Sequence, residues 1–196
     1  MNERVRLRGY HHGDLRNALK NAARSILEEE GLGALSLRAV ARKAGVSHAA
    51  PYRHYPNHEA LLVELAIEGF SELCADIAAT GAESDPVADR ISEIGAGYMR
   101  FVARRPALAR LMFGAQLPNR DAYPELSQAA DAVAVQIGQS LNDRALGLAV
   151  WAAVHGLAML ALENVIDLGQ KRSGLGVLPS RAKILLRSLF TLPEQG

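Results

Sequence analysis

Apolar residues recur along this chain with the three-to-four-residue period of amphipathic helices, and the alternation typical of β-strands is missing. The first apolar stripe covers residues 15–27 and is stopped by Gly31. A long helix is predicted from about Pro56 and Asn57 to residues 80–81. Further helices are predicted at residues 87–104, 107–114, 124–141, 144–168 and 180–191, with loops at residues 115–123 and 169–179. The pattern therefore predicts an all-α protein of about nine helices.

Two short helices are predicted between the first stripe and the long helix. Ser36 is a favourable N-cap residue for the first of them. The face that follows is apolar at Leu37, Val40, Ala41 and Ala44. Gly45 then supplies the left-handed residue that ends a helix, Val46 fills the corner, and Ser47 is expected to cap a third helix. Short helices joined by such a tight turn form the helix-turn-helix pattern of DNA-binding proteins.

Charge is unevenly distributed, although the net charge of the whole chain is only +1. Residues 1–58 hold ten Lys/Arg and five Asp/Glu, whereas residues 59–196 hold twelve and sixteen. Residues 31–58 contain no acidic side chain, and a surface that is merely soluble normally mixes both signs. We therefore predict a helix-turn-helix domain at residues 1–58 that meets nucleic acid. Residues 59–196 are predicted to form a helical effector-binding and dimerisation domain.

The cellular setting follows from cysteine usage and from one apolar segment. Cys74 is the only cysteine, which excludes an intrachain disulfide and fits a reducing cytoplasm. The N-terminus has no apolar run that predicts a signal peptide. Residues 145–162 carry no formal charge and approach the length of a membrane span. His155 within the segment, and Arg144 and Glu163 at its ends, favour a core or subunit-interface helix, so no membrane partner is predicted.

The N-terminal residues closely resemble the DNA-binding domain of the TetR family of bacterial transcription regulators. The matching residues are Ser36, Val40, Ala41, Ala44, Gly45, Val46, Ser47, Tyr52, Tyr55, Pro56, Glu59 and Leu61. In the second half, Trp151, His155 and Gly156 resemble a family subgroup with a Trp-x-x-x-His-Gly signature. The resemblance implies three N-terminal helices with a helix-turn-helix, followed by a larger helical domain.

Two residues depart from the family pattern. Pro51 stands where members often have an aliphatic residue. Because proline lacks an N–H and biases Ala50 away from the α-helical region, we expect the third helix to begin as a tight or irregular turn. His58 stands where many members carry a lysine, and a neutral imidazole is a weaker phosphate partner. Tyr55 is expected to pack beneath the motif.

The resemblance assigns a DNA-binding face to this domain. The first turn of the third helix is expected in the major groove, with Ala49 near a thymine methyl and His48 near a purine N7 or a phosphate. Ser36 and the N-terminus of the second helix are expected at another phosphate, as are Tyr52 and His54. For the basic side chains of the second helix, a solvated surface is the alternative. The predicted DNA-binding residues are Ser36, Arg38, Arg42, Lys43, Ser47, His48, Ala49, Tyr52, Arg53 and His54.

Other candidate chemistry in the sequence is weaker. Arg4, Arg6 and Arg8 precede the first helix and are interpreted either as a minor-groove arm or as a solvated tail. His54 and His58 have the i, i+4 spacing of a metal-binding pair, but no third ligand is evident, so no metal site is predicted. Catalytic motifs are missing, and we expect neither an enzyme nor a cofactor.

A ligand cavity is the functional interpretation of the aromatic and sulfur-containing residues in the second domain. Trp151 is the only tryptophan, and His155 lies on the same face of its helix. For Trp151 the alternative is packing, with the indole N–H bound to a carbonyl; for His155 it is a satisfied core histidine. The predicted ligand-binding residues are Tyr98, Phe101, Met112, Phe113, Trp151, His155 and Met159. The effector is expected to be small and largely apolar.

These features predict a repressor that binds a palindromic operator in double-stranded DNA as a homodimer and leaves it when an effector binds. A four-helix interface is expected between the eighth and ninth helices of two copies. Its predicted residues are Leu146, Val150, Val154, Leu157, Ile184, Leu185, Leu189 and Leu192. The alternative is a dimeric small-molecule-binding protein whose degenerate helix-turn-helix does not bind DNA, which the departures at Pro51 and His58 motivate.

Overall fold

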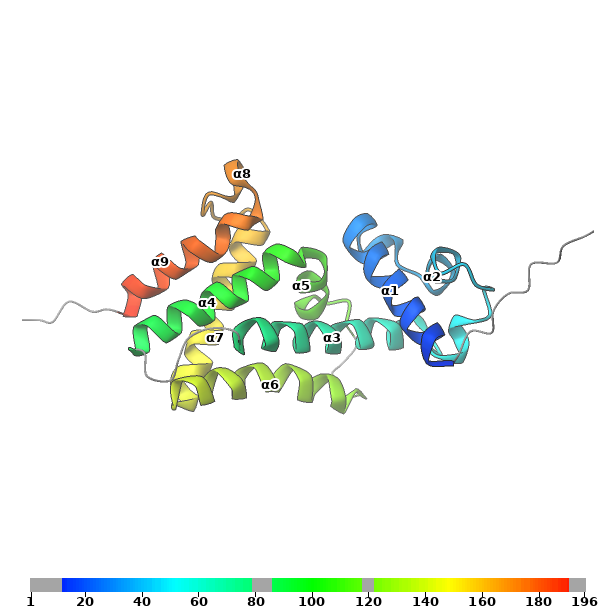
Figure 1. Ribbon diagram of the computed structural model, residues 1–196, viewed down its shortest axis with the longest axis horizontal. Helices are drawn as coiled ribbons and strands as arrows, with labels where there is room; N and C mark the ends of the chain where they lie inside the picture. The colour runs from blue at the N-terminus through cyan, green and yellow to red at the C-terminus, as the bar shows by residue number, and fades with distance from the viewer. Residues whose placement is uncertain (1–11, 79–85, 118–121, 191–196) are drawn as a thin grey trace, which may run out of the picture. The chain divides into compact units, whose positions relative to one another are not determined.

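The computed structural model describes residues 12–78, 86–117 and 122–190, and these segments contain helices and no strand (Figure 1). The helices are α1 His12–Glu30, α2 Leu37–Lys43, α3 His58–Ala78, α4 Val87–Arg104, α5 Pro106–Phe113, α6 Pro124–Leu141, α7 Arg144–Leu162, α8 Gln170–Ser173 and α9 Leu178–Phe190. Single 3-10 turns are η1 Leu32–Ala34, η2 Pro51–Arg53 and η4 Leu175–Val177. The all-α prediction is confirmed for the described residues. The chain forms two compact units, residues 1–65 and 66–196, and α3 contributes to both.

The core of the N-terminal unit is built on the apolar stripe predicted for α1. Helix α1 packs against α2 and η1, and α2 packs against η2. Buried apolar side chains come from α1, α2, the segment before α3 and the start of α3: Leu19, Ala23, Ile26, Leu27, Leu37, Val40, Ala41, Tyr55, Leu61 and Leu62. The burial of Tyr55 agrees with its predicted place beneath the motif.

The turn after α2 has the conformation that its sequence predicts. Gly45 is left-handed, with a φ of 69°. Its N–H donates to the carbonyl of Arg42 at 3.2 Å, and the N–H of Val46 donates to the carbonyl of Ala41 at 3.0 Å. This pair of bonds is a Schellman motif, which satisfies the carbonyls that the end of α2 leaves open.

The segment predicted as the third helix consists of turns and η2 instead. The N–H of Ala50 donates to the carbonyl of Ser47, and that of His54 donates to the carbonyl of Pro51, both at 2.9 Å. Because Pro51 has no N–H, the α-helical bond from position 51 to Ser47 is impossible, and the tighter three-residue spacing takes its place. Ala50 nevertheless lies in the α region, with φ −62° and ψ −42°. The expectation that Pro51 moves Ala50 out of that region was therefore wrong.

In the second unit, α4 packs against α5, α6, α7 and α9, and α6 packs closely against α7. Gly147 makes the α6–α7 contact possible, since a Cβ on it would lie 2.5 Å from the Cα of Gly138. Asp143 then caps α7 by accepting hydrogen bonds from the N–H groups of Ala145 and Leu146 at 2.9 and 3.0 Å.

Two boundaries in the C-terminal part differ from the predictions. The helix predicted at residues 144–168 ends at Leu162, because Asn164 adopts a left-handed conformation with a φ of 57°. The loop predicted at residues 169–179 contains α8 and η4. Gln170 anchors this segment: its side-chain amide is buried and donates to two main-chain carbonyls at 3.0 and 2.7 Å.

Helix α7 buries one face and exposes the other. Val150 and Val154 are fully buried within the protomer, so the prediction that they form a dimer interface was wrong. Leu148 and Leu160 are 57% and 43% exposed, and Ala149, Ala152 and Ala153 are exposed too. By length and composition alone α7 is able to cross a membrane, a test that the core helix of a soluble protein also passes.

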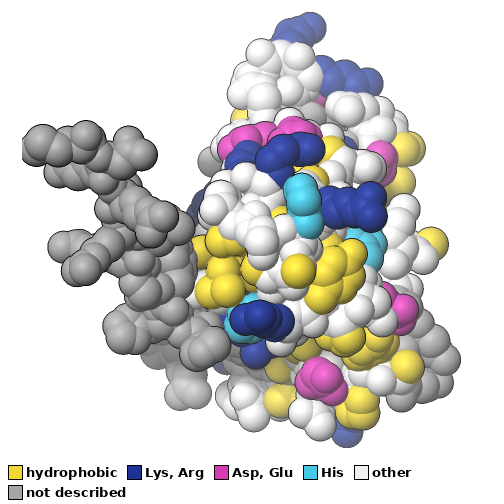
Figure 2. Space-filling view, turned by 90° about the vertical axis from the view of Figure 1, so that its right-hand side faces the viewer, with side chains coloured by type: hydrophobic (Ala, Val, Ile, Leu, Met, Phe, Trp, Pro, Cys, Tyr) yellow, Lys and Arg dark blue, Asp and Glu magenta, His cyan; other side chains and the backbone are white. Residues whose placement is uncertain are grey.

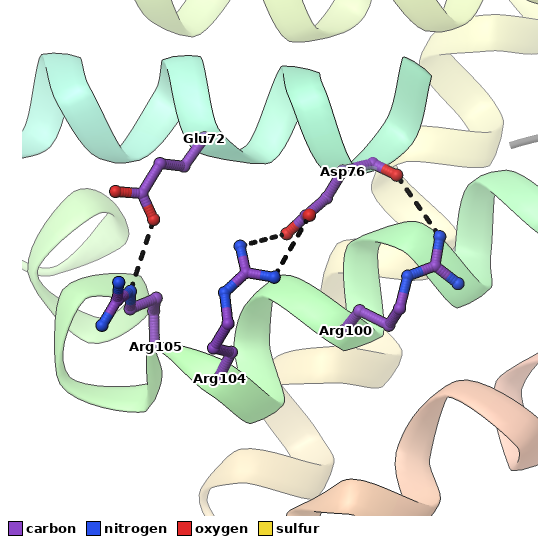
Figure 3. A network of polar contacts seen from close by, with 5 residues as sticks. All are labelled: Glu72, Asp76, Arg100, Arg104 and Arg105. Atoms are coloured by element: carbon purple, nitrogen blue, oxygen red, sulfur yellow. Dashed lines mark hydrogen bonds and ion pairs between the residues drawn. The ribbon is translucent and has the colours of Figure 1, made fainter. Parts of the chain in front are cut away.

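A polar network joins α3 to α4 and α5 in the second unit (Figure 3). Arg104 donates to both carboxylate oxygens of Asp76, at 3.2 and 2.8 Å. Arg105 donates to Glu72 at 3.3 Å, and Arg100 donates to the main-chain carbonyl of Asp76 at 3.4 Å. Each exposed pair alone stabilises little, but together they fix the second half of α3 against α4.

Candidate nucleic-acid interface and ligand site

The ten predicted DNA-binding residues all lie at the surface of the N-terminal unit. Nine are exposed, His54 is half-buried, and the Tyr52 side chain is 52% exposed although it is large and aromatic. Figure 2 shows the side on which α1 and α2 are drawn in Figure 1. Lys, Arg and His side chains lie around a hydrophobic patch on this face, with some acidic side chains among them. Exposed basic side chains of this kind are suited to a polyanionic partner.

The N-termini of α2 and α3 meet at an open pocket of about 410 Å³, here called the cap pocket. Its lining residues are Ser36, Leu37, Arg38, Tyr52, Pro56, Asn57 and His58. Ser36 Oγ accepts from the N–H of Ala39 at 3.1 Å, and Asn57 Oδ1 accepts from the N–H of Ala60 at 2.8 Å. No lining residue is acidic. Helix N-termini, hydroxyls and a guanidinium at one place are the groups that bind phosphate.

Asn57 is a polar residue of the cap pocket that the predicted DNA-binding set does not include. Asparagine is a strong N-cap residue, and its place immediately before α3 is a signal that the sequence contains. What the sequence does not show is that the N-terminus of α3 lies beside that of α2. His58, which the predicted DNA-binding set also leaves out, lines the cap pocket as well.

Lys43 forms an ion pair with Glu29, which lies outside the acid-free residues 31–58. Its Nζ donates to Glu29 Oε2 at 2.6 Å, and this hydrogen bond lowers the pKa of the Glu29 carboxyl. The pair joins the end of α1 to the end of α2. A phosphate that binds Lys43 therefore competes with Glu29, although exposed pairs of this kind are weak.

The underside of the motif is held by Tyr55. Its ring is 1% exposed, and the guanidinium of Arg16 lies 6.0 Å from the ring centroid. Arg16 is in turn paired with Glu64 at 2.7 Å. Burial, reinforced by the charge of Glu64, raises the pKa of Tyr55 to about 12. The phenol therefore stays neutral and serves as a structural support.

In the second unit, four of the predicted ligand-binding residues lie close together around α7. The Tyr98 hydroxyl is 2.8 Å from His155 Nδ1, and the Phe113 ring lies 4.3 Å from the His155 ring. Tyr98 is fully buried, whereas His155 is half-buried. Burial raises the pKa of the Tyr98 phenol and lowers that of the His155 imidazole, so both groups are neutral at pH 7.

Trp151 completes this group. Its Nε1 is buried beside the Tyr98 hydroxyl, and this indole N–H lowers the pKa of Tyr98 against the larger, opposite effect of burial. Trp151, His155 and Met159 follow one another at four-residue spacing on α7, and all three are half-buried. Phe101 and Met112 are fully buried core residues.

A second opening, of about 700 Å³, follows the groove between α6 and α7. Trp151 lines it, but the other predicted ligand residues do not. Its lining residues are Asp131, Ala134, Val135, Gly138, Gln139, Asn142, Asp143, Arg144, Leu148 and Trp151. The sequence gives no sign of this groove, because it forms only where α6 and α7 pack against each other.

Two family models match the chain. The model for bacterial regulatory proteins of the tetR family matches residues 19–65, and the model for the tetracyclin repressor-like C-terminal domain matches residues 91–173. The chain belongs to the TetR family. The first match includes the whole cap pocket, and the second includes Tyr98, Trp151 and His155, so both candidate sites lie within TetR-like sequence.

Individual TetR-like relatives agree with this assignment. The HTH-type transcriptional regulator Rv1816 of Mycobacterium tuberculosis is 30% identical over 101 residues, which span 50% of this chain and 43% of that protein. The match thus spans less than half of the relative's length. A solved structure of a protein with unknown function from Rhodococcus sp. RHA1 is 31% identical, with a TM-score of 0.69 over 93% of this chain and 98% of that one. A tetR family regulatory protein from Rhodococcus RHA1 has a TM-score of 0.72 at 18% identity over 92% of this chain and 98% of that one, which supports the fold.

Proposed function

We propose that this TetR family chain is a transcriptional repressor that binds a palindromic operator as a homodimer and leaves it when a small apolar effector binds. The observation that carries the DNA-binding part is the cap pocket. It combines two capped helix N-termini with Arg38 and Tyr52 and has no acidic residue in its lining. The basic arm predicted at Arg4, Arg6 and Arg8 lies outside the described residues.

The homodimer is supported by apolar surface on α7 and α9. Ile184 and Leu189 of α9 are 63% and 65% exposed, and Leu148 of α7 is 57% exposed. Leu192, also predicted for this interface, lies outside the described residues. A two-fold axis through these helices places two DNA-binding units on half-sites about 34–36 Å apart, or a multiple of that distance.

Regulation by an effector is supported by the half-buried aromatic group around Tyr98 and His155. Bound effector then weakens operator binding, and bound operator weakens effector binding, by the same coupling free energy, on the order of 1–3 kcal/mol. Helix α3 belongs to both units of the chain, which makes it the structural link for that coupling.

The deciding experiment measures affinity for duplex DNA as a function of salt. Selection of bound fragments from the source genome supplies the operator. We expect log affinity to fall steeply and linearly with log salt concentration, since each phosphate contact contributes a slope of about −0.9. Arg38→Ala should weaken binding and make the slope less steep by about 0.9 per protomer. Arg172→Ala removes the same charge from exposed α8 and is the matched control.

A second function is favoured by one observation, the replacement of the third helix by η2. In this alternative the chain is a dimeric small-molecule-binding protein that does not bind DNA. This alternative predicts an intact dimer that has no affinity for any DNA duplex at low salt. The Arg38→Ala and Arg172→Ala variants would then both show the same lack of DNA binding as the parent protein.

A further inference from the structure

Histidine is concentrated in the DNA-binding part of this chain. Five of its six histidines fall within residues 1–58, and the sixth is His155. Residues 31–58, which hold no Asp or Glu, contain four Lys/Arg and three histidines. Histidine side chains typically titrate at about pH 6.5. The charge of this segment therefore increases below neutral pH from +4, the four Lys/Arg alone, towards +7 with all three imidazoles protonated.

His58 is the histidine of this segment that lines the cap pocket, whereas His48 and His54 do not. It is the first residue of α3, and its side chain is exposed and makes no hydrogen bond or ion pair with the described residues. The N-terminus of α3 is capped by its neighbour instead, since Asn57 Oδ1 accepts from the N–H of Ala60 at 2.8 Å. The His58 imidazole is therefore available to a ligand in the pocket.

The groups that face His58 come from the elements that meet at the cap pocket. Helix α2 contributes the Arg38 guanidinium, η2 contributes the Tyr52 phenol, and α1 contributes no lining residue. Helix α3 carries Glu59 in its first turn, but Glu59 does not line the pocket. The lining thus offers a protonated imidazole no carboxylate. A DNA phosphate supplies the missing negative charge, and a nearby opposite charge favours the protonated ring.

We propose that operator binding is linked to proton uptake by His58. The protonated ring contacts a DNA phosphate at the cap pocket, so operator affinity rises as pH falls through neutrality. The linkage is reciprocal, because bound DNA favours protonation of His58 to the same extent that protonation favours DNA binding. The DNA-binding unit then responds to acidity without an effector. This inference rests on the DNA-binding function proposed above, which the tetR family match over residues 19–65 supports independently of the pocket.

The test measures the affinity of the full-length protein for its selected operator at pH 8.0 and pH 6.0, at constant ionic strength. We expect affinity to be about 10-fold higher at pH 6.0, with uptake of up to about one proton per protomer. Calorimetry in two buffers of different ionisation enthalpy measures that uptake. The plot of log affinity against log salt should be steeper at pH 6.0 by up to about 0.9 per protomer, because one further cationic contact forms.

Three variants assign the pH response to one imidazole. His58→Gln keeps a polar side chain without a titratable charge, so it should bind as the parent does at pH 8.0 and gain less than twofold at pH 6.0. His58→Lys is charged at both pH values and should bind at pH 8.0 about as tightly as the parent binds at pH 6.0. His48→Gln removes an exposed imidazole outside the pocket and is the matched control, which should keep most of the response.

The outcomes separate this linkage from DNA binding itself. Parent affinity that changes less than twofold between the two pH values, an absence of proton uptake, or a full pH response in His58→Gln would each overturn the linkage and leave the DNA-binding function standing. If neither the parent nor His58→Lys binds any duplex at low salt at either pH, the proposed DNA-binding function is wrong and the linkage is wrong with it.

Discussion

Ser36 caps α2 and also lines the cap pocket, and substitutions can separate these two features. Its Oγ accepts from the N–H of Ala39 at 3.1 Å, which caps α2, and the residue also lines the cap pocket. Ser36→Ala should lower the free energy of unfolding by about 1 kcal/mol, the usual loss for an N-cap. Ser36→Asp retains a good cap but brings a negative charge to the pocket. We expect near-normal stability with at least 10-fold weaker DNA binding, measured by urea unfolding and by operator titration. Equal DNA affinity in the serine and aspartate proteins would remove Ser36 from the interface.

Capping and exposure of single residues in the predicted DNA-binding set could be predicted because both depend on local sequence. Ser36 is recognised as a cap by its type and position, and the exposed basic residues by the absence of acids within residues 31–58. Lys43 shows the limit, since its partner Glu29 lies outside that stretch and is brought near only by the packing of α1 on α2. The Tyr98–His155 bond likewise joins residues 57 positions apart, which no local pattern encodes.

At the scale of elements, the turn after α2 offers a clean test of backbone conformation. Gly45 has a φ of 69°, and a Cβ placed on it would meet nothing within 4 Å. Gly45→Ala should therefore cost about 1–2 kcal/mol of unfolding free energy, entirely from the left-handed conformation. Gly45→Asn should cost less, because asparagine tolerates that region. Denaturant unfolding of the three proteins checks this order, and an alanine protein as stable as the parent would contradict the assigned turn.

The bounds of helices with a regular apolar stripe were predicted better than those of segments where the apolar pattern is interrupted or runs past the helix end. The stripes at residues 87–104 and 124–141 give α4 and α6 with the predicted bounds. Glu163 marked the end of the uncharged segment, but the apolar residues at 165, 166 and 168 led the predicted helix past it, whereas the left-handed Asn164 ends α7 at Leu162. Pro51 signalled an irregular segment, but the sequence alone did not show that turns extend over the whole of the expected helix.

At the scale of the whole molecule, the strongest remaining expectation concerns how two copies meet. Exposed apolar side chains on α7 and α9 are more numerous than a monomer of this size needs, and Ile184, Leu189 and Leu148 are each more than half exposed. The buried positions of Val150 and Val154 shift the predicted interface to the opposite face of α7. The dimer proposal therefore depends on the outer face of α7 together with α9.

Charge substitutions on these helices test where the interface lies. Ile184→Glu and Leu148→Glu should each convert the dimer to a monomer at micromolar concentration, measured by sedimentation velocity, because a dimer would bury two unpaired carboxylates at its axis. Val135→Glu on α6 is the matched control, since Val135 is 54% exposed but lies outside the predicted interface. Operator affinity should fall in parallel with dimerisation, as two linked half-site contacts become independent. If Val135→Glu and Leu148→Glu disrupt the dimer and Ile184→Glu does not, the two copies meet along the α6–α7 groove instead, because Val135 and Leu148 both line it. Trp151 would then lie near the subunit boundary, because it lines that groove.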